Sequence, residues 1–140
     1  PIKSTLSAGL LPVIFGDVVF DEHLGGTILS TEEQMKHLVP TLKPTRIYLA
    51  GLEEGVWQDF PACTRLIETI TTASYPKVRN HVFGSSSTDV TGGMASKVAE
   101  MMALVVEYPQ LEVNIFSGKQ PEAIYKALAG ESIGTVLRDH

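Results

Sequence analysis

The sequence of 140 residues contains a single cysteine, Cys63, and no apolar run that approaches the roughly 18 residues of a membrane-spanning helix. One cysteine excludes an intrachain disulfide and a cysteine metal cluster, and we expect an inert loop thiol rather than a reactive one. The residues also show no signal peptide. These absences predict a cytoplasmic protein that does not act in a membrane.

Runs of lysine or arginine are absent as well, and the formal net charge is −5. A protein that binds nucleic acid non-specifically needs clustered cations to neutralise phosphates, so this class of function is disfavoured. The familiar motifs G-x-G-x-x-G, G-x-x-x-x-G-K-[ST] and G-x-S-x-G are also missing. If the protein binds a nucleotide, it does so by another design.

What the sequence does contain is an alternation of strand and helix patterns. The apolar content of 44 % with mixed charges suits one globular domain. Apolar and β-branched runs predict strands at 11–15, 46–50, 64–72, 112–116 and 134–137. Helical signals begin at residues 30, 94 and 121, whereas 75–83 is ambiguous. This order predicts an α/β fold in which helices cover the faces of a sheet.

Residues 88–97 form the most informative stretch, because a polar loop runs into Gly92 and Gly93 and then directly into a helix. The residues that share one face of this helix are Met94, Val98, Met101, Met102 and Val105. A helix start offers unpaired N–H groups and the positive end of the dipole, and Lys97 adds a cation, so the stretch suits a phosphate. A tight turn and a solvated lysine explain the same residues equally well.

Gly16 and Asp17 follow the predicted strand 11–15, and ligands of open α/β sheets bind beyond the carboxyl ends of strands. Gly16 would allow a substrate group to approach closely, and Asp17 would orient a lysine or a substrate hydroxyl. A strand-ending turn is the alternative. The next turn, 21–26, contains two acids and a histidine, but adjacent residues do not converge well on one ion, so we expect a solvated turn.

Ser30 to Glu33 has the form of a capping box, in which a serine and a glutamate three residues later satisfy the first N–H groups of a helix. The residues predicted to face inward from this helix are Met35, Leu38, Val39 and Leu42. Pro40 is expected to bend or shorten the helix. The dipole favours acids at a helix start, so a structural role explains Glu32 and Glu33 adequately.

The ordered set of motifs resembles the C-terminal half of the amino acid kinase superfamily and, within it, the isopentenyl phosphate kinases. The stretches that carry the resemblance are 11–21, 27–30, 89–94 with Lys97, 117–118 and 130–135. Each is modest alone, but together they span nearly the whole chain in the right order. The resemblance implies a three-layer αβα sandwich with a mainly parallel sheet, of which residues 1–140 would form the C-terminal, ATP-binding half.

The same resemblance implies a reaction. ATP with Mg²⁺ would transfer its γ-phosphoryl group to isopentenyl phosphate, a small-molecule acceptor, and isopentenyl diphosphate would be formed for isoprenoid biosynthesis. Lys97 would contact the β- and γ-phosphates. The backbone around the nucleotide would come from Ala50, Gly51, Gly55, Gly92 and Gly93. The full-length protein would be a homodimer.

The resemblance also gives roles to residues near the start of the chain. Gly16 and Asp17 would lie near the phosphoryl-transfer centre. Thr31 would face the substrate phosphate, where the family usually has glycine, and Glu32 would replace the organising aspartate. The nucleotide loop of the family, Thr-Asp-Val-Asp-Gly, is here residues 51–55, which lack one of the acids.

Two alternatives follow from these departures. One is a related kinase with another acceptor, such as a fosfomycin-type phosphonate or a nucleoside monophosphate. The other is a non-catalytic, nucleotide-binding regulatory module. The family's N-terminal Lys-Gly-Gly-Ser segment and its substrate-binding histidine are not found in these residues, so we expect the 140 residues alone to be inactive.

Overall fold

The computed structural model describes residues 1–82 and 93–140, without the side chains of residues 81 and 82. The chain divides into two compact units, Pro1–Thr41 and Leu42–His140.

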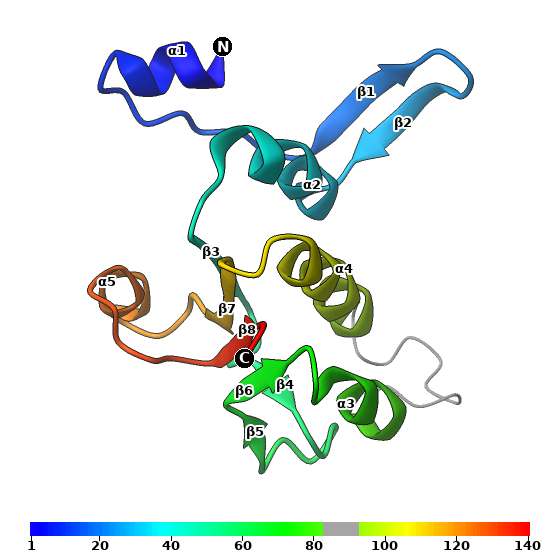
Figure 1. The fold of residues 1–140 in the computed structure, drawn as a ribbon, viewed down its shortest axis with the longest axis vertical. Helices are drawn as coiled ribbons and strands as arrows, with labels where there is room; N and C mark the ends of the chain where they lie inside the picture. Colours follow the sequence, from blue (N-terminus) through cyan, green and yellow to red (C-terminus); the bar gives the residue numbers. More distant parts are fainter. Residues whose placement is uncertain (83–92) are drawn as a thin grey trace. The chain divides into compact units, whose positions relative to one another are not determined.

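The first unit contains a short helix, a hairpin and a longer helix. These elements are α1 (Ile2–Ser7), β1 (Asp17–Asp21), β2 (Gly25–Leu29) and α2 (Thr31–Leu42) (Figure 1). Strands β1 and β2 pair antiparallel, with Asp17 opposite Leu29. The Asp21 carboxylate accepts the backbone N–H groups of His23 and Leu24 at 2.9 and 2.8 Å, and these bonds lower its pKa. The turn is therefore organised by its own aspartate, as expected of a turn and not of a metal site.

The predicted capping box is confirmed at the start of α2. The Ser30 hydroxyl accepts the Glu33 N–H at 3.1 Å, and the Glu33 carboxylate accepts the Ser30 N–H at 2.9 Å. Pro40 lies inside the helix, which nevertheless continues to Leu42. Of the residues predicted to face inward, Val39 is buried, whereas Leu42 is 36 % exposed.

The predicted buried strand at 11–15 is wrong. These residues form no strand, and Leu11, Val13 and Phe15 are 84, 83 and 73 % exposed. A strand buried on both faces needs elements packed against both, and within residues 1–82 and 93–140 no strand pairs with this run. The side chain of Gln34 donates a hydrogen bond from Nε2 to the Phe15 carbonyl oxygen at 2.7 Å. Gly16 consequently precedes a strand instead of following one.

The second unit is built on a four-stranded sheet in the order β3-β7-β8-β6. The strands are β3 (Arg46–Gly51), β6 (Thr69–Thr71), β7 (Glu112–Ser117) and β8 (Thr135–Arg138). The pairs β3–β7 and β6–β8 are parallel, and β7–β8 is antiparallel. The sheet is thus mainly parallel, as predicted. A separate two-stranded ribbon joins β4 (Val56–Trp57) to β5 (Leu66–Ile67).

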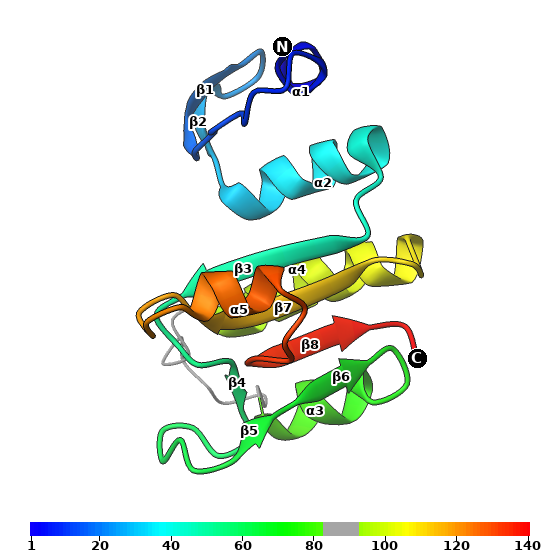
Figure 2. The ribbon, with the colours of Figure 1, turned by 90° about the vertical axis from the view of Figure 1, so that its left-hand side faces the viewer.

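Helices cover both faces of this sheet (Figures 1 and 2). On one face lie α3 (Tyr75–Val82) and α4 (Met94–Glu107), with α4 in contact with β7 and β8. On the other face lies α5 (Ala123–Leu128), whose Ala123 and Ala127 pack against Phe116 and Tyr48. The two rings meet edge to face with centroids 6.4 Å apart. The three-layer prediction is confirmed for this unit.

The core of the second unit follows from the periodicities of its strands and helices. On α4 the predicted inward residues Val98, Met101 and Val105 are buried completely. On β7, Val113 and Ile115 are likewise buried. One boundary differs, because α5 begins at Ala123 and not at Pro121: Glu122, at its N-cap, has a φ of 62°. No helix of the described residues is long and apolar enough to cross a membrane.

Candidate functional site

Several loops of the second unit meet at one edge of its sheet. Strands β3 and β7 are parallel, so both end there, and β8 is antiparallel to β7, so it begins there, with Thr135 opposite Ile115. Helix α4 precedes β7 through a tight turn, so its N-terminus lies at the same edge (Figure 2). This is the edge at which open α/β sheets bind ligands. Loop 51–55 leaves β3 at this edge.

The beginning of loop 51–55 is held by the end of β7. The Gly118 N–H donates to the Gly51 carbonyl oxygen at 2.9 Å, and the Ser117 hydroxyl donates to the Leu52 carbonyl oxygen at 3.3 Å. A Cβ on Gly118 would lie 3.3 Å from the Ala50 Cβ. Glycine at this position therefore allows the two loops to pass close to each other.

The end of loop 51–55 is held by the start of β8. The Thr135 hydroxyl accepts the Val56 N–H at 2.8 Å and donates to the Ile67 carbonyl oxygen at 2.6 Å. Gly134 precedes it with a φ of 66°, and a Cβ there would collide with the Ile115 carbonyl and lie 2.9 Å from the Glu54 carbonyl oxygen. The loop is thus fixed at both ends, by β7 and by β8.

The predicted nucleotide residues of this loop differ in exposure. Ala50 and Gly51 are exposed, and a Cβ on Gly51 would meet nothing within 4 Å. Gly55 is buried, and a Cβ there would lie 2.6 Å from the Thr135 Oγ1. Gly51 therefore offers open backbone to a ligand, whereas Gly55 lets the loop close on Thr135. A contact between either glycine and a nucleotide stays a prediction.

The start of α4 provides the predicted phosphate elements. Gly93 is its N-cap, with a φ of 81° and open space where a Cβ would stand. Lys97 lies one turn into the helix, where its N–H donates to the Gly93 carbonyl oxygen at 2.9 Å, and its side chain is half-buried. Gly92 and the preceding polar residues lie outside the described part of the chain. Gly93 and Lys97 are therefore brought together by one helical turn, at the edge that also carries loop 51–55.

The remaining predicted site residues form a separate group in the first unit. A Cβ on Gly16 would lie 2.8 Å from the Leu29 carbonyl oxygen and 3.6 Å from the Thr31 nitrogen, so Gly16 lies beside the start of α2. Thr31 and Glu32 open that helix. The exposed Asp17 opens β1, and its Oδ1 accepts the N–H of Val18 at 2.7 Å. The structure therefore gathers Gly16, Thr31 and Glu32 around one helix N-terminus.

Cys63 belongs to the loop between β4 and β5. Desolvation and the nearby carboxylates of Glu53 and Asp59 raise the pKa of its thiol, the opposite of what a reactive cysteine needs. The Asp59 carboxylate organises this loop by accepting the N–H groups of Thr64 and Arg65 at 3.1 and 3.0 Å. The bond from the Thr64 hydroxyl is the largest cause of the lowered pKa of Asp59. The loop is structural in character.

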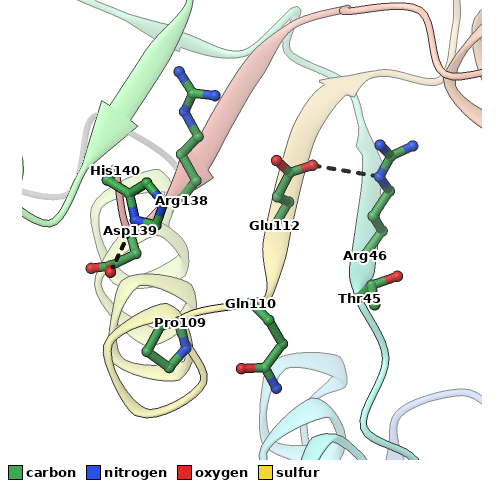
Figure 3. Close-up of a pocket in the computed structure, with 8 residues that line it drawn as sticks. All are labelled: Thr45, Arg46, Pro109, Gln110, Glu112, Arg138, Asp139 and His140. Atoms are coloured by element: carbon green, nitrogen blue, oxygen red, sulfur yellow. Dashed lines mark hydrogen bonds and ion pairs between the residues drawn. The ribbon is translucent and has the colours of Figure 1, made fainter.

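A pocket of about 520 Å³ lies at the opposite edge of the sheet. Figure 3 shows the side chains that line it. It is lined by Thr45, Arg46, Pro109, Gln110, Glu112, Arg138, Asp139 and His140. An ion pair joins Arg46 Nε to Glu112 Oε2 at 3.4 Å, and the His140 ring nitrogen Nδ1 lies 3.3 Å from Asp139 Oδ2. The Arg46 guanidinium thus faces a carboxylate of the same pocket. We place the candidate site at the other edge, because the glycine-rich loops and the α4 N-terminus meet there.

One feature of the site depends on residues far apart in sequence. The Thr135 hydroxyl accepts a hydrogen bond from the Val56 N–H, 79 residues away in sequence, and no local sequence pattern predicts this contact. The signal in the sequence is a glycine–threonine pair, which is predicted only as the start of a strand and as part of the stretch 130–135 that carries the family resemblance. Within the described residues, no group of three or more histidine, cysteine, aspartate or glutamate side chains is placed to hold a metal.

The chain matches the model of the amino acid kinase family over residues 1–117. It is 35 % identical to the isopentenyl phosphate kinase of Methanocaldococcus jannaschii over 136 residues, which cover 97 % of this chain and 49 % of that protein. Identity to the isopentenyl phosphate kinase of Haloferax volcanii is also 35 %, over 97 % of this chain and 50 % of that one. The chain thus spans about half the length of the curated relatives it matches.

Solved structures give the same result for the fold. A structure described as "X-ray structures of isopentenyl phosphate kinase" superposes with a TM-score of 0.73 at 28 % identity, and the match covers 97 % of this chain and 49 % of that one. A second, described as an isopentenyl phosphate kinase substrate complex, has a TM-score of 0.69 at 23 % identity. The fold of this chain therefore corresponds to about half of those enzymes.

Proposed function

Because this chain belongs to the amino acid kinase family, we propose that it is the nucleotide-binding half of an isopentenyl phosphate kinase. The reaction is the transfer of the γ-phosphoryl group of ATP to isopentenyl phosphate. The observation that carries the proposal is the meeting of loop 51–55, the β7–α5 turn and the α4 N-terminus at one sheet edge, in a chain whose reported relatives are isopentenyl phosphate kinases.

The residues at this edge fit a nucleoside triphosphate. Open backbone at Gly51 and Gly93 leaves room for phosphate oxygens, and the first N–H groups of α4 supply donors. In this proposal Ala50 and Gly51 border the nucleotide, Gly55 shapes the loop, Gly92 and Gly93 border the phosphates, and Lys97 neutralises charge on the β- and γ-phosphates. A lysine in the first turn interacts unfavourably with the helix dipole, at a cost of about 0.3–1 kcal/mol, and a bound phosphate would offset this cost.

Mg²⁺ suits the same arrangement. Proteins usually hold this ion through substrate phosphates, waters and one or two carboxylates, and not through a dedicated cage of side chains. In the proposal the ion is held mainly by the ATP phosphates. Its chemistry would be to neutralise negative charge as the phosphoryl group moves, which is what such transfers chiefly require besides positioning.

The first unit contains the residues that the proposal assigns to the acceptor. Thr31 and Glu32 open α2, and Gly16 lies beside them, so this helix N-terminus would receive the acceptor phosphate. Asp17 and Glu32 would orient the charged groups around the transferred phosphoryl. Glu32 reaches one methylene further than the aspartate of the family. The proposal also includes a homodimer of the full-length protein and a cytoplasmic location.

The acceptor distinguishes this proposal from the other kinases of the superfamily. Each relative reported above is an isopentenyl phosphate kinase, which favours isopentenyl phosphate over a phosphonate or a nucleoside monophosphate. Full-length protein would be incubated with ATP, Mg²⁺ and each acceptor in turn, and ADP and the phosphorylated product would be quantified. Turnover only with a phosphonate or a nucleoside monophosphate, or nucleotide binding without any turnover, would contradict the proposal.

Lys97→Met tests the placement of the phosphates. Loss of a charge-assisted bond to phosphate costs about 1.5–3 kcal/mol, so we expect the affinity for Mg²⁺-ATP to fall roughly tenfold to a hundredfold. Lys77→Met, on α3, is the matched control and should leave this affinity unchanged. Isothermal titration calorimetry with a non-hydrolysable ATP analogue measures both. Equal affinities in the two variants would remove Lys97 from the phosphate site.

A further inference from the structure

Thr135 is a polar residue with no solvent exposure at the start of β8. Its hydroxyl uses both its donor and its acceptor capacity. It accepts the N–H of Val56, whose side chain is 1 % exposed, at 2.8 Å and donates to the Ile67 carbonyl oxygen at 2.6 Å. One side chain thus joins three strands, namely β4, β5 and β8. A buried hydroxyl that satisfies two backbone groups at once is costly to remove.

The position of these bonds matters as much as their number. Val56 is the first residue after loop 51–55, so the bond fixes the end of that loop, whereas Ser117 and Gly118 fix its beginning. Between the two anchors, residues 51–54 are exposed. The loop is therefore a short exposed span held at both ends.

We propose that Thr135 is a positioning residue that sets the affinity for nucleotide by holding loop 51–55 in its binding geometry. This inference rests on the proposed function, because loop 51–55 is the loop assigned there to the nucleotide. Thr135 is buried beneath the loop and does not itself touch the ligand. Its effect arises because a loop that populates the binding geometry only part of the time binds more weakly by that fraction.

Three substitutions separate this role from a general contribution to stability. Thr135→Val keeps the shape of the side chain but leaves the Val56 N–H and the Ile67 carbonyl without their partner. Thr135→Ser keeps the hydroxyl and loses only a methyl group. The matched control is Thr72→Val, because the Thr72 hydroxyl also joins two parts of the chain, bonding the Asp139 carbonyl oxygen at 2.8 Å and Oδ1 at 3.0 Å, but beyond the carboxyl end of β6, at the opposite edge of the sheet.

Two readouts would be taken on the full-length protein at a temperature where every variant is folded. The first is the affinity for a non-hydrolysable ATP analogue with Mg²⁺, by calorimetry. The second is the emission spectrum of Trp57, the single tryptophan in these 140 residues, which directly follows Val56 and is half-buried. In the full-length protein, Trp57→Phe identifies its contribution. Trp57 emission reports the geometry of the loop end whether or not a nucleotide binds.

We expect Thr135→Val to weaken nucleotide binding by about tenfold or more and to shift the Trp57 emission. Thr135→Ser should restore both, and Thr72→Val should lower the melting temperature without changing either. If Thr135→Val does not fold, Thr135→Cys replaces it, since a thiol is a weak donor and acceptor. Nucleotide affinity within twofold of the parent in the folded variant would overturn the inference.

The failure of the proposed function would look different. In that case the parent protein itself binds no nucleotide, and the assignment of loop 51–55 to ATP is overturned for all variants together. Trp57 emission then still decides whether Thr135 holds the loop. An unchanged spectrum in Thr135→Val would show that it does not.

Discussion

The two units of this chain differ in where their apolar side chains lie. In the second unit, residues such as Ile70, Val113 and Leu137 have no solvent exposure. In the first unit, Leu11 and Phe20 are 84 and 98 % exposed. Apolar residues recur in both units, so their pattern in the sequence does not show whether another element covers them. Burial requires a partner element, and in the second unit the partners lie within the described residues.

The largest expected effect is on the free energy of unfolding, and it is tested by substituting one glycine in each unit. Gly134→Ala in the second unit places a Cβ against the Ile115 carbonyl, in a backbone conformation that alanine rarely adopts. We expect a loss of more than about 4 kcal/mol in unfolding free energy, or no folded protein. Gly26→Ala in the first unit would meet only the Val18 side chain at 4.0 Å, and we expect a change within about 0.5 kcal/mol.

Urea denaturation followed by circular dichroism measures both glycine variants. If Gly134→Ala were as stable as Gly26→Ala, the backbone at Gly134 could not lie as close to the Ile115 and Glu54 carbonyl groups as it does in the structure. If Gly26→Ala were the more damaging, the hairpin of the first unit would be packed against something that the described residues do not include.

A smaller effect is expected at the capping box of α2. Ser30→Ala removes an N-cap acceptor and should cost about 1 kcal/mol. The cap also responds to pH, because bonds from the Ser30 backbone and hydroxyl lower the pKa of Glu33 in the folded chain. A lowered folded-state pKa contributes stability above the pH range in which glutamate ordinarily titrates, and that stability is lost as the pH falls through this range.

The pH dependence of the cap can be tested with a variant that does not titrate. Glu33→Gln keeps a side-chain acceptor but does not titrate. The free energy of unfolding of this variant should therefore fall less than that of the parent between neutral and acidic pH. Thermal melts across this range measure the difference. Parallel curves for Glu33→Gln and the parent would show that the carboxylate makes no net contribution.

Sequence patterns predicted the elements whose signals are local. The capping box fixed the start of α2, and the spacing of Met101 and Val105 fixed the buried face of α4. The sequence pattern over 75–83 is ambiguous, although Pro76 lies in the first turn of α3, a position that suits proline. Of the candidate site, the glycine turns and Lys97 were found in this way, and the structure brings Gly51, Gly93 and Lys97 to one edge.

The rest depended on partners that sequence does not specify. The run 11–15 has the composition of a buried strand, yet a strand forms only where another strand supplies hydrogen bonds. The sequence around Thr135 predicts the start of a strand but not the partner of its hydroxyl, since Val56 lies 79 residues away in sequence. The antiparallel placement of β8 is likewise a long-range choice, and it is what brings Thr135 to the site.

The smallest expected effect concerns the pocket at the opposite edge. Arg46→Met removes a half-exposed ion pair with Glu112 across β3 and β7, which at such exposure is worth about 0–1 kcal/mol and is screened by salt. We expect a small loss of stability at low salt, no loss at high salt, and unchanged nucleotide affinity. Melts at two ionic strengths and calorimetry check this. A weakened affinity would move the ligand site to this pocket.

The strand order has a consequence for biosynthesis. Strand β8 lies between β7 and β6, and β6 joins the sheet only through it. Yet β8 is the last of these strands to leave the ribosome, since it begins at Thr135. A nascent chain that already carries β3, β6 and β7 therefore has an unfilled place in the middle of its sheet, and loop 51–55 has no anchor at its far end. The edge that carries the candidate site is completed only after synthesis of β8, so this unit folds late and as a whole.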